Sequence, residues 1–423
     1  MIGNIDPLLL RMVGQRLSPL RNISRVRYDG FEDLAIINSQ ILNVKILGGE
    51  VVKPSYSAGQ SIDLSRAISA AIGEALERHG GTCPPFQSTI LHGCFADLHT
   101  RHPLFPLEDT WLFSREQIST QGFDLRNVEA EDAVDWLKGV LYETEEPRDI
   151  YFPLSRITLD SKLCDPFDIS TSNGFALGSS FAEACQSALC EYLERAAFLE
   201  TWWLKRSPNL FTFEDCLALP MPSIHLYAQW LGSRLHVLDL SDTWGVPTFI
   251  CAIRGRGDAE PVLTVSGAAH AHGPTALRKS IEETMRIFLG RIEGVRPSIK
   301  PIAMPFDDSL RTFEDIENLY WSKETSAWAE FLFAGQRLGA EFLKRRLASP
   351  AVSIRAEVLK RGGRILAFDL TPIDLAQAEL SLARVIVPDA IPLNVAHKAR
   401  PWGCPRLRAF SVADLNPMPH PFL

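Results

Sequence analysis

The feature that most constrains the fold is a pattern of small residues and glutamates that occurs three times. It reads AISAAIGEALER at 67–78, ACQSALCEYLER at 184–195 and ALRKSIEETMR at 276–286. Each copy is typical of a helix with small residues on one side and a cation three or four residues after a glutamate. Because the copies are irregularly spaced, they do not indicate a solenoid. The pattern predicts that the same kind of helix, with a glutamate and a cation beside small residues, occurs three times within a single fold.

The first two copies each place two acids three residues apart, so that both project from one helix face. These acids are Glu74, Glu77, Glu191 and Glu194. A single copy is better explained as a surface helix, since Glu74 with Arg78 and Glu191 with Arg195 are common i,i+4 pairs. The neighbouring small residues, however, allow helices to pack closely beside the acids.

Several carboxylates gathered in one place would stay ionised only with cations between them. Mg²⁺ takes oxygen ligands and completes its shell with water and phosphate oxygens. Together with Arg78 and Arg195, the acids therefore predict a nucleoside triphosphate that is bound through Mg²⁺. The loop SNGFALGSS at 172–180 could offer backbone N–H groups to an anion at a helix N-terminus, or could be a simple Ser/Gly N-cap.

Other nucleotide and hydrolase motifs are absent from the sequence. There is no GxxxxGK[ST], no GxGxxG after a strand, no HExxH and no GxSxG. These absences argue against a Walker-type ATPase, a zincin and an α/β-hydrolase.

Composition and charge exclude further classes. The 423 residues are 46% hydrophobic and carry a net charge of −8, which argues against broad nucleic-acid binding. We expect no membrane partner, because no apolar run approaches the ~18–20 residues that span a bilayer. The eight cysteines include no CxxC pair, so we expect free thiols and a cytoplasmic location.

Strand and helix patterns alternate along the chain, which favours an α/β or α+β fold taken as one unit. Strands are expected within 34–52 and 149–159, as a pair beginning at 234 and 245, and in 364–371 and 383–394. Residues 1–50 are interpreted as a solvent-facing N-terminal arm or partner-docking segment.

Three longer blocks resemble the signature blocks of the YcaO superfamily. They are AGQSIDLSRAISAAIGEALER, SNGFALGSSFAEACQSALCEYLER and SGAAHAHGPTALRKSIEETMR, and the resemblance runs from about Gly59 to the C-terminus. It implies a YcaO-type fold with several sheets, a catalytic domain over 51–423, and helices that form an acidic, non-Walker site for ATP and Mg²⁺. The family activates peptide-backbone amides.

The resemblance also implies roles for individual residues. The positions matching magnesium ligands are Glu74, Glu77, Glu191 and Glu194, and those expected at the nucleotide are Arg78, Ser179, Glu183, Arg195, Lys279 and Glu283. Two positions depart from the family pattern. Gly59-Gln60-Ser61 stands where the family usually has GKG, and Lys279 replaces an arginine, which keeps the charge but loses bidentate geometry.

The C-terminal sequence NPMPHPFL resembles the tail of the azoline-forming cyclodehydratases. Its PxPxP pattern comprises Pro417, Pro419 and Pro421, and in that branch the tail reaches toward the active site, so we expect a catalytic role for these prolines. A frayed proline-rich end is the alternative interpretation. The segments VIVPDAIPLN and GCPRLR are similar to the final blocks of the same branch.

The branch resemblance implies the D-type component of a thiazole/oxazole-modified microcin synthetase. Such an enzyme would use ATP to convert Cys, Ser or Thr of a ribosomal precursor peptide to thiazoline or oxazoline. His270, His420 and the C-terminal carboxylate are candidates for moving protons. Alternatives are thioamide or macrocyclic amidine formation, a non-catalytic peptide-binding scaffold, and an ATP-dependent amide ligase.

Partners follow from the same resemblance. We expect a separate ubiquitin-activating-like protein that binds the leader peptide, because the chain has no evident room for that domain. A flavin-dependent azoline dehydrogenase is a further expected component. The implied assembly is a dimer or a hetero-oligomeric synthetase complex, with no nucleic acid in it.

Overall fold

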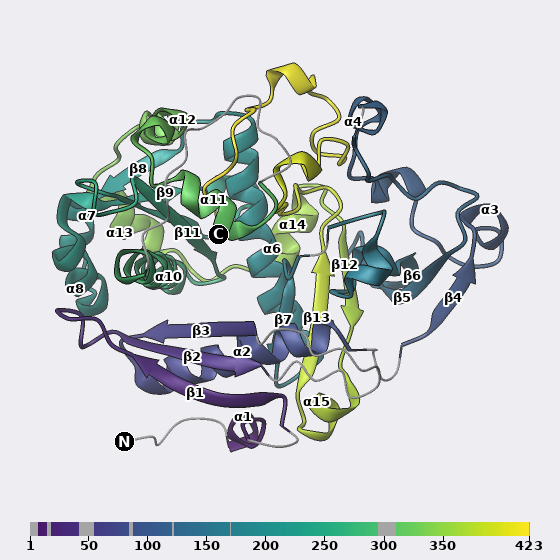
Figure 1. The fold of residues 1–423 in the computed structure, drawn as a ribbon, viewed down its shortest axis with the longest axis horizontal. Helices are drawn as coiled ribbons and strands as arrows, with labels where there is room; N and C mark the ends of the chain where they lie inside the picture. Colours follow the sequence, from purple (N-terminus) through teal and green to yellow (C-terminus); the bar gives the residue numbers. More distant parts are fainter. Residues whose placement is uncertain are drawn as a thin grey trace.

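A computed structural model describes residues 7–14, 18–41, 55–83, 88–120, 122–169, 171–294 and 310–422. Within these ranges, three antiparallel sheets surround a long helix, α6 (Phe181–Trp203), which runs through the middle of the molecule (Figure 1). Almost every residue of α6 after Ala188 is buried, as expected for a helix that lies in a core rather than on a surface. The expected mixed α/β (α+β) fold is confirmed.

The first sheet has the order β1-β2-β3, from β1 (Leu20–Val26), β2 (Ala35–Ile41) and β3 (Ser55–Ser61). Helix α2 (Leu64–Gly81) lies directly on it, with the Ser39 hydroxyl donating to the Ala71 carbonyl at 2.7 Å. A Cβ at Gly59 would come within 2.1 Å of the Ala67 carbonyl oxygen, so only glycine permits this close approach.

Part of the segment expected to be a solvent-facing arm lies in this sheet. Ile36 and Ile37 of β2 are only 2% and 3% exposed, because they pack into the core under α2 and α10. This burial differs from a projecting arm, although a boundary at residue 50 stays a prediction. Of the strand region expected at 34–52, β2 is present, and residues 42–54 lie outside the described ranges.

The second sheet has the order β11-β10-β9-β8. Its strands are β8 (Asn209–Thr212), β9 (Leu235–Asp239), β10 (Thr248–Arg254) and β11 (Leu263–Ala269). The expected pairing of the segments that begin at 234 and 245 is confirmed, since β9 and β10 pair antiparallel. Helix α10 (Gly273–Glu293) covers this sheet, and its Thr284 hydroxyl lies over the carbonyls of β10 and β11.

The third sheet has the order β4-β5-β12-β13-β7, with β6 added on β5. Its strands are β4 (Ile90–Gly93), β5 (Val134–Tyr142), β6 (Arg148–Pro153), β7 (Phe175–Gly178), β12 (Ile365–Asp369) and β13 (Ser381–Ile386). Helix α6 packs on β13 and β7 and also on β11, so it joins the second and third sheets.

Shorter helices complete the described structure. They are α1 (Pro7–Arg11), α3 (Phe95–Leu98), α4 (Arg115–Ser119), α5 (Ser161–Cys164), α7 (Phe213–Leu217), α8 (Pro222–Leu231), α9 (Ser241–Trp244), α11 (Phe313–Leu319), α12 (Ser326–Ala329), α13 (Ala340–Ala348), α14 (Ile354–Lys360) and α15 (Ile373–Gln377). Single 3₁₀ turns lie at Leu107–Thr110, Leu154–Arg156, Gly232–Arg234, Lys323–Thr325, Glu330–Phe333, His397–Ala399 and Val412–Asp414. No helix in the described ranges has the length and apolar character needed to cross a membrane.

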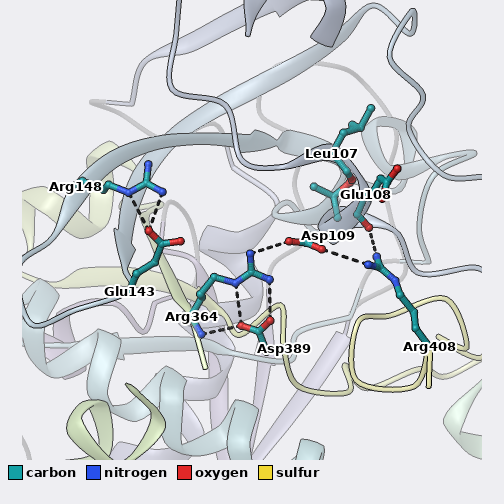
Figure 2. Close-up of polar contacts among 9 residues, drawn as sticks. Leu107, Glu108, Asp109, Glu143, Arg148, Arg364, Asp389 and Arg408 are labelled. Carbon is teal, nitrogen blue, oxygen red and sulfur yellow. Dashed lines mark hydrogen bonds and ion pairs between the residues drawn. The ribbon is translucent and has the colours of Figure 1, made fainter. Parts of the chain in front are cut away.

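A network of ion pairs fixes distant segments around Arg364, at the start of β12 (Figure 2). The Arg364 guanidinium donates to Asp389 at 2.7 and 3.0 Å and to Asp109 at 2.7 Å. Arg408 donates to the second oxygen of Asp109 at 3.3 Å. These contacts join the 3₁₀ turn at Leu107–Thr110, the third sheet and the segment before the C-terminal tail.

Candidate active site

The first pair of predicted acids lies on α2 and connects two sheets. Glu77 accepts a hydrogen bond from the Leu177 N–H of β7 at 2.9 Å. Glu74 accepts one from the Ala58 N–H of β3 at 3.2 Å and one from Arg78 at 2.5 Å. The two carboxylates therefore face the space between β3, β7 and the start of α6.

The second pair lies on α6. Glu191 accepts from the Gly174 N–H at 3.1 Å and forms an ion pair with Arg195. Glu194 is 9% exposed and extends across β11, where a Cβ on Gly267 would lie 3.2 Å from its Cγ. Gly174 has φ +77°, and a Cβ there would meet the Val385 carbonyl oxygen at 2.4 Å, so glycine is needed in the SNG loop.

The serines of the Ser/Gly loop form hydrogen bonds with the first turn of α6. The Ser180 side chain caps the helix by accepting from the Glu183 N–H at 3.3 Å. In return, Glu183 accepts from the Ser179 N–H at 3.0 Å and from its hydroxyl. The N-cap interpretation thus holds for Ser180, and the same turn lines the cavity described below.

Helix α10 has two consecutive acids whose side chains point to different neighbours. Glu282 accepts from the Tyr227 hydroxyl at 2.7 Å and pairs with Arg278 on the side toward α8. Glu283 lines the cavity with Lys279, which lies one turn earlier on the same helix. Only the second acid therefore joins those of α2 and α6.

One cavity of about 870 Å³ brings the predicted residues together. Its lining includes all ten residues expected to bind metal or nucleotide: Glu74, Glu77, Arg78, Ser179, Glu183, Glu191, Glu194, Arg195, Lys279 and Glu283. The ten come from α2, α10, α6 and the loop before α6, as the threefold pattern predicts. Their individual roles stay predictions.

The cavity brings several buried carboxyl groups close together. Burial and the neighbouring Glu191 raise the pKa of Glu77 to about 8. Burial and Glu283 raise the pKa of Glu194 to about 8, and burial likewise raises the pKa of Glu283 itself. Glu77 and Glu194 therefore hold protons near neutral pH unless cations replace them.

The cationic groups leave donors for an anion. Burial alone would lower the pKa of the Arg195 guanidinium, but the surrounding carboxylates, Glu191 first, raise it. The Nε atoms of Arg195 and of Arg286 are buried and have no hydrogen-bond partner among the described residues. Since an unpaired buried donor is costly, both sites fit the oxygens of a phosphate group.

The same residues fit Mg²⁺ bound together with a nucleotide. Within the described ranges, no three His, Cys, Asp or Glu side chains converge closely enough to hold a metal ion by themselves. Mg²⁺ usually takes only one or two carboxylates, and its remaining ligands are water and substrate phosphates. The arrangement of separate acids around a shared cavity is therefore compatible with an ion that is completed by phosphate.

The departure from GKG in the first block is visible in the cavity wall. Gln60 lines the cavity, and its buried side-chain oxygen has no partner in the described structure. An amide at this position offers a hydrogen bond without the charge of a lysine.

The C-terminal tail lies beside the cavity rather than in its lining. Pro417 is exposed, whereas Pro419 and Pro421 are buried. The Tyr320 hydroxyl donates to the Pro419 carbonyl at 2.6 Å, and the Phe422 ring packs against the Phe198 ring in a tilted arrangement with centroids 4.7 Å apart. The tail is thus packed from 419 to 422, unlike a frayed end.

Phe422 also forms a parallel bridge with Val265 of β11. Ala268 and Ala269, at the end of that strand, line the cavity. The tail therefore runs along β11 in the direction of the cavity.

The two histidines proposed to move protons lie in different surroundings. His420 is 1% exposed and donates from Nε2 to the Asn394 carbonyl at 2.8 Å. It is not part of the cavity lining, whereas His270 is. The third candidate, the C-terminal carboxylate on Leu423, lies outside the described residues.

Arg286 was not among the predicted site residues, although it lines the cavity. The signal was present in the sequence, because Arg286 is the cation that ends the third copy of the pattern. Gln186 and Ser187 of α6 also line the cavity, and nothing in their residue types distinguishes them from a solvated helix face.

A fold of three sheets around α6, with acids from three helices facing one cavity, defines a class of ATP-binding enzymes without a Walker loop. The family model described as YcaO cyclodehydratase, ATP- and Mg²⁺-binding, matches residues 58–391. This chain belongs to the YcaO family, and its cofactors are ATP and Mg²⁺. No curated protein matches the sequence significantly.

Solved structures share the fold at low sequence identity. A heterocyclase in complex with substrate and cofactor aligns at TM-score 0.73 and 17% identity over 98% of this chain and 56% of its own length. The E. coli microcin synthetase McbBCD complex aligns at TM-score 0.59 and 14% identity, covering 94% and 96%. YcaO from Methanopyrus kandleri, bound with AMPPCP and Mg²⁺, aligns at TM-score 0.57 and 14% identity, covering 95% and 90%.

The heterocyclase TruD aligns at TM-score 0.59 and 18% identity over 85% of this chain. The chain thus spans about half the length of the two heterocyclases that it matches, 56% of the first and 51% of TruD.

Proposed function

We propose that this chain catalyses ATP-dependent cyclodehydration of a ribosomally synthesised precursor peptide, converting Cys, Ser or Thr to thiazoline or oxazoline. The proposal depends on one observation, the cavity to which α2, α6 and α10 each contribute carboxylates. Family membership supports the reaction class, and the likeness to heterocyclases and to a microcin synthetase supports this branch of it.

The reaction must remove a carbonyl oxygen that would leave poorly as hydroxide. The Cys, Ser or Thr side chain bonds to the preceding carbonyl carbon and loses its proton, and the π electrons move to the oxygen. This oxygen bonds to the γ-phosphorus of ATP as the bond to the leaving ADP oxygen breaks. Phosphate then departs with the electrons of the C–O bond, while the amide nitrogen loses its proton and forms the C=N bond.

The protein would contribute by positioning and by electrostatics, the usual sources of phosphoryl-transfer catalysis. Mg²⁺ would be held by one or two carboxylates per ion from the set Glu74, Glu77, Glu191 and Glu194, and would neutralise charge on the transferring phosphoryl group. The residues proposed to orient the nucleotide are Arg78, Ser179, Glu183, Arg195, Lys279 and Glu283, and the unpartnered donor of Arg286 supports adding it to this set.

The tail is proposed to complete the reacting end of the cavity. Its direction along β11 supports a role for Pro417, Pro419 and Pro421 in bringing the end of the chain near the peptide. The prolines restrict the backbone of an extended segment, so they would hold this direction at a low entropic cost.

We further propose that the chain works within a cytoplasmic synthetase complex. One solved relative is a microcin synthetase complex with pro-MccB17 bound, which supports a peptide substrate and several protein components. The proposed partners are a leader-binding ubiquitin-activating-like protein and a flavin-dependent azoline dehydrogenase, and a dimer or hetero-oligomer is the expected assembly.

The test is incubation with a precursor peptide, the leader-binding partner, ATP and Mg²⁺, followed by mass spectrometry. Loss of one water per modified residue, matched by release of one phosphate, is the expected result. Exchange of oxygen for sulfur would indicate thioamide formation instead, and loss of one water between a backbone amide and the peptide's amino terminus would indicate a macrocyclic amidine. If the peptide mass did not change in the presence of ATP, the result would favour the alternative of a non-catalytic peptide-binding scaffold.

A further inference from the structure

His270 lies directly after the end of β11 and three residues before the start of α10. Its backbone N–H donates to the Pro247 carbonyl at 3.0 Å, which fixes the residue on the second sheet. Its half-buried side chain lines the cavity beside Ala269 and Lys279. The imidazole is therefore held at the cavity wall.

The two ring nitrogens of His270 have different partners. Nδ1 accepts a hydrogen bond from the backbone N–H of His272 at 3.0 Å. Nε2 has no hydrogen-bond partner among the described residues. A backbone N–H can only donate, so Nδ1 must present its lone pair, and the proton of the neutral ring stands on Nε2.

The surroundings favour the neutral ring. Burial lowers the pKa of His270, and the positive charge of Lys279 lowers it further, with smaller effects from His272 and Arg278. A second proton would have to go on Nδ1, which would break the bond to the His272 N–H. The accessible nitrogen is consequently a donor, and it cannot act as the general base.

A neutral donor suits one oxygen in the reaction. The peptide oxygen becomes negative when the ring closes, and it must remain unprotonated to attack phosphorus. An imidazolium could give it a proton and quench it, whereas a neutral imidazole N–H stabilises the charge and keeps its proton. The phosphates, in contrast, have proposed cationic partners in Arg195, Lys279 and Arg286, which line the same cavity.

We propose that neutral His270 donates a hydrogen bond through Nε2–H to the peptide oxygen that is about to be phosphorylated. The inference rests on the proposed cyclodehydration and assigns the catalytic role to His270 rather than to His420, whose Nε2–H is already used by the Asn394 carbonyl.

The test is a pair of substitutions that separate the two nitrogens. His270→Asn keeps an acceptor near the Nδ1 position and loses the donor at Nε2, whereas His270→Gln places an amide N–H near Nε2. His272→Asn is the matched control, because its side chain bonds Thr275 at 3.1 Å and does not line the cavity. The assay measures kcat and KM for the peptide and for ATP in the complete synthetase.

We expect His270→Asn to lower kcat about 100-fold with KM for ATP changed less than about twofold. His270→Gln should recover a large part of that loss, and His272→Asn should match the wild type. An unchanged kcat in His270→Asn, a loss confined to KM for ATP, or a Gln variant no better than Asn would overturn the inference while the proposed function stood. A wild-type chain that forms no azoline would overturn both.

A second measurement does not depend on turnover. ¹⁵N NMR of histidine-labelled protein, with His270 assigned from the His270→Gln variant, reports which nitrogen bears the proton. We expect the Nε2–H form at neutral pH and above, because burial and Lys279 lower the pKa of His270. An Nδ1–H ring or an imidazolium in this range would overturn the assignment.

Discussion

Glu77 and Glu194 differ from surface glutamates in the pH at which they ionise, since each has a pKa of about 8. Near neutral pH the ligand-free cavity holds protons that Mg²⁺ must displace. We therefore predict that Mg²⁺-ATP affinity rises with pH up to about 8 and that binding releases protons. Calorimetry in two buffers of different ionisation enthalpy measures this release. Binding without proton release would contradict the prediction.

The same shift predicts an effect of Glu194→Gln on stability. A glutamate with a folded-state pKa above its unfolded value stabilises the fold below the unfolded pKa, and this contribution is lost as pH rises toward 8. Glutamine does not ionise, so the ligand-free variant should not lose stability in this way as the pH rises. It should be more stable than wild type by at least about 1 kcal/mol at about pH 9. Urea unfolding at about pH 6 and about pH 9 tests it.

In the same variant, phosphate release with peptide and Mg²⁺-ATP should fall below detection. Glu293→Gln, an exposed acid at the end of α10, should change neither quantity. A Glu194→Gln protein with wild-type turnover would remove the metal role from this residue. A protein that does not fold at about pH 6 would contradict the stability argument, since at that pH the substitution replaces a carboxyl group that is already neutral.

At the scale of elements, the position of α2 on β3 sets where Glu74 and Glu77 stand. We predict that Gly59→Ala destabilises the protein by about 2 kcal/mol or more, because its Cβ would meet the backbone of α2 at Ala67 and Ala71. Displacing α2 should also weaken Mg²⁺-ATP binding. Chemical unfolding and calorimetry measure the two effects.

Gly73→Ala is the matched control for stability. A Cβ at Gly73 meets nothing within 4 Å, and alanine is favoured over glycine within a helix by about 1 kcal/mol. We expect this variant of the same helix to be at least as stable as wild type. If Gly59→Ala were equally harmless, the close approach of α2 and β3 would not determine the site.

The sequence was sufficient to predict which helices meet, but not how the tail and the first sheet are placed. The repeated acids beside small residues indicated close helix packing, and those ten side chains do share a cavity. A PxPxP pattern says only that the backbone is extended. Its partners, Tyr320 and Trp203, lie about 100 and more than 200 residues earlier, and only tertiary packing brings them to the tail.

Strand β1 was missed for a related reason, whereas β2 lies within the strand region expected at 34–52. β1 is largely exposed and polar, so it lacks the alternation that identifies a half-buried strand, and its partner is specified by register with β2 rather than by composition. Local patterns therefore predicted helices more reliably than sheet membership here.

At the scale of the whole molecule, the network around Arg364 connects segments more than 250 residues apart (Figure 2). We predict that Arg364→Leu destabilises the protein by about 2–3 kcal/mol, because it leaves Asp109 and Asp389 without their shared partner in a largely buried setting. Urea unfolding measures the loss, which should shrink as salt rises.

The control for this prediction is Arg148→Leu, in the same view. Arg148 and its partner Glu143 are 52% and 44% exposed, so their ion pair should contribute less than about 1 kcal/mol. Equal losses in the two variants would mean that burial does not distinguish these ion pairs.

Helix α6 has one further consequence for how such enzymes can diversify. Glu183 in its first turn accepts from the Ser179 N–H of the preceding loop, and the carbonyls of Trp202 and Trp203 in its last turn accept from Asn416, where the tail begins. The length of α6 thus sets the distance between the proposed nucleotide site at its first turn and the start of the tail at its last turn. A foreign tail grafted onto this scaffold would need the matching final turn of α6 to keep that spacing.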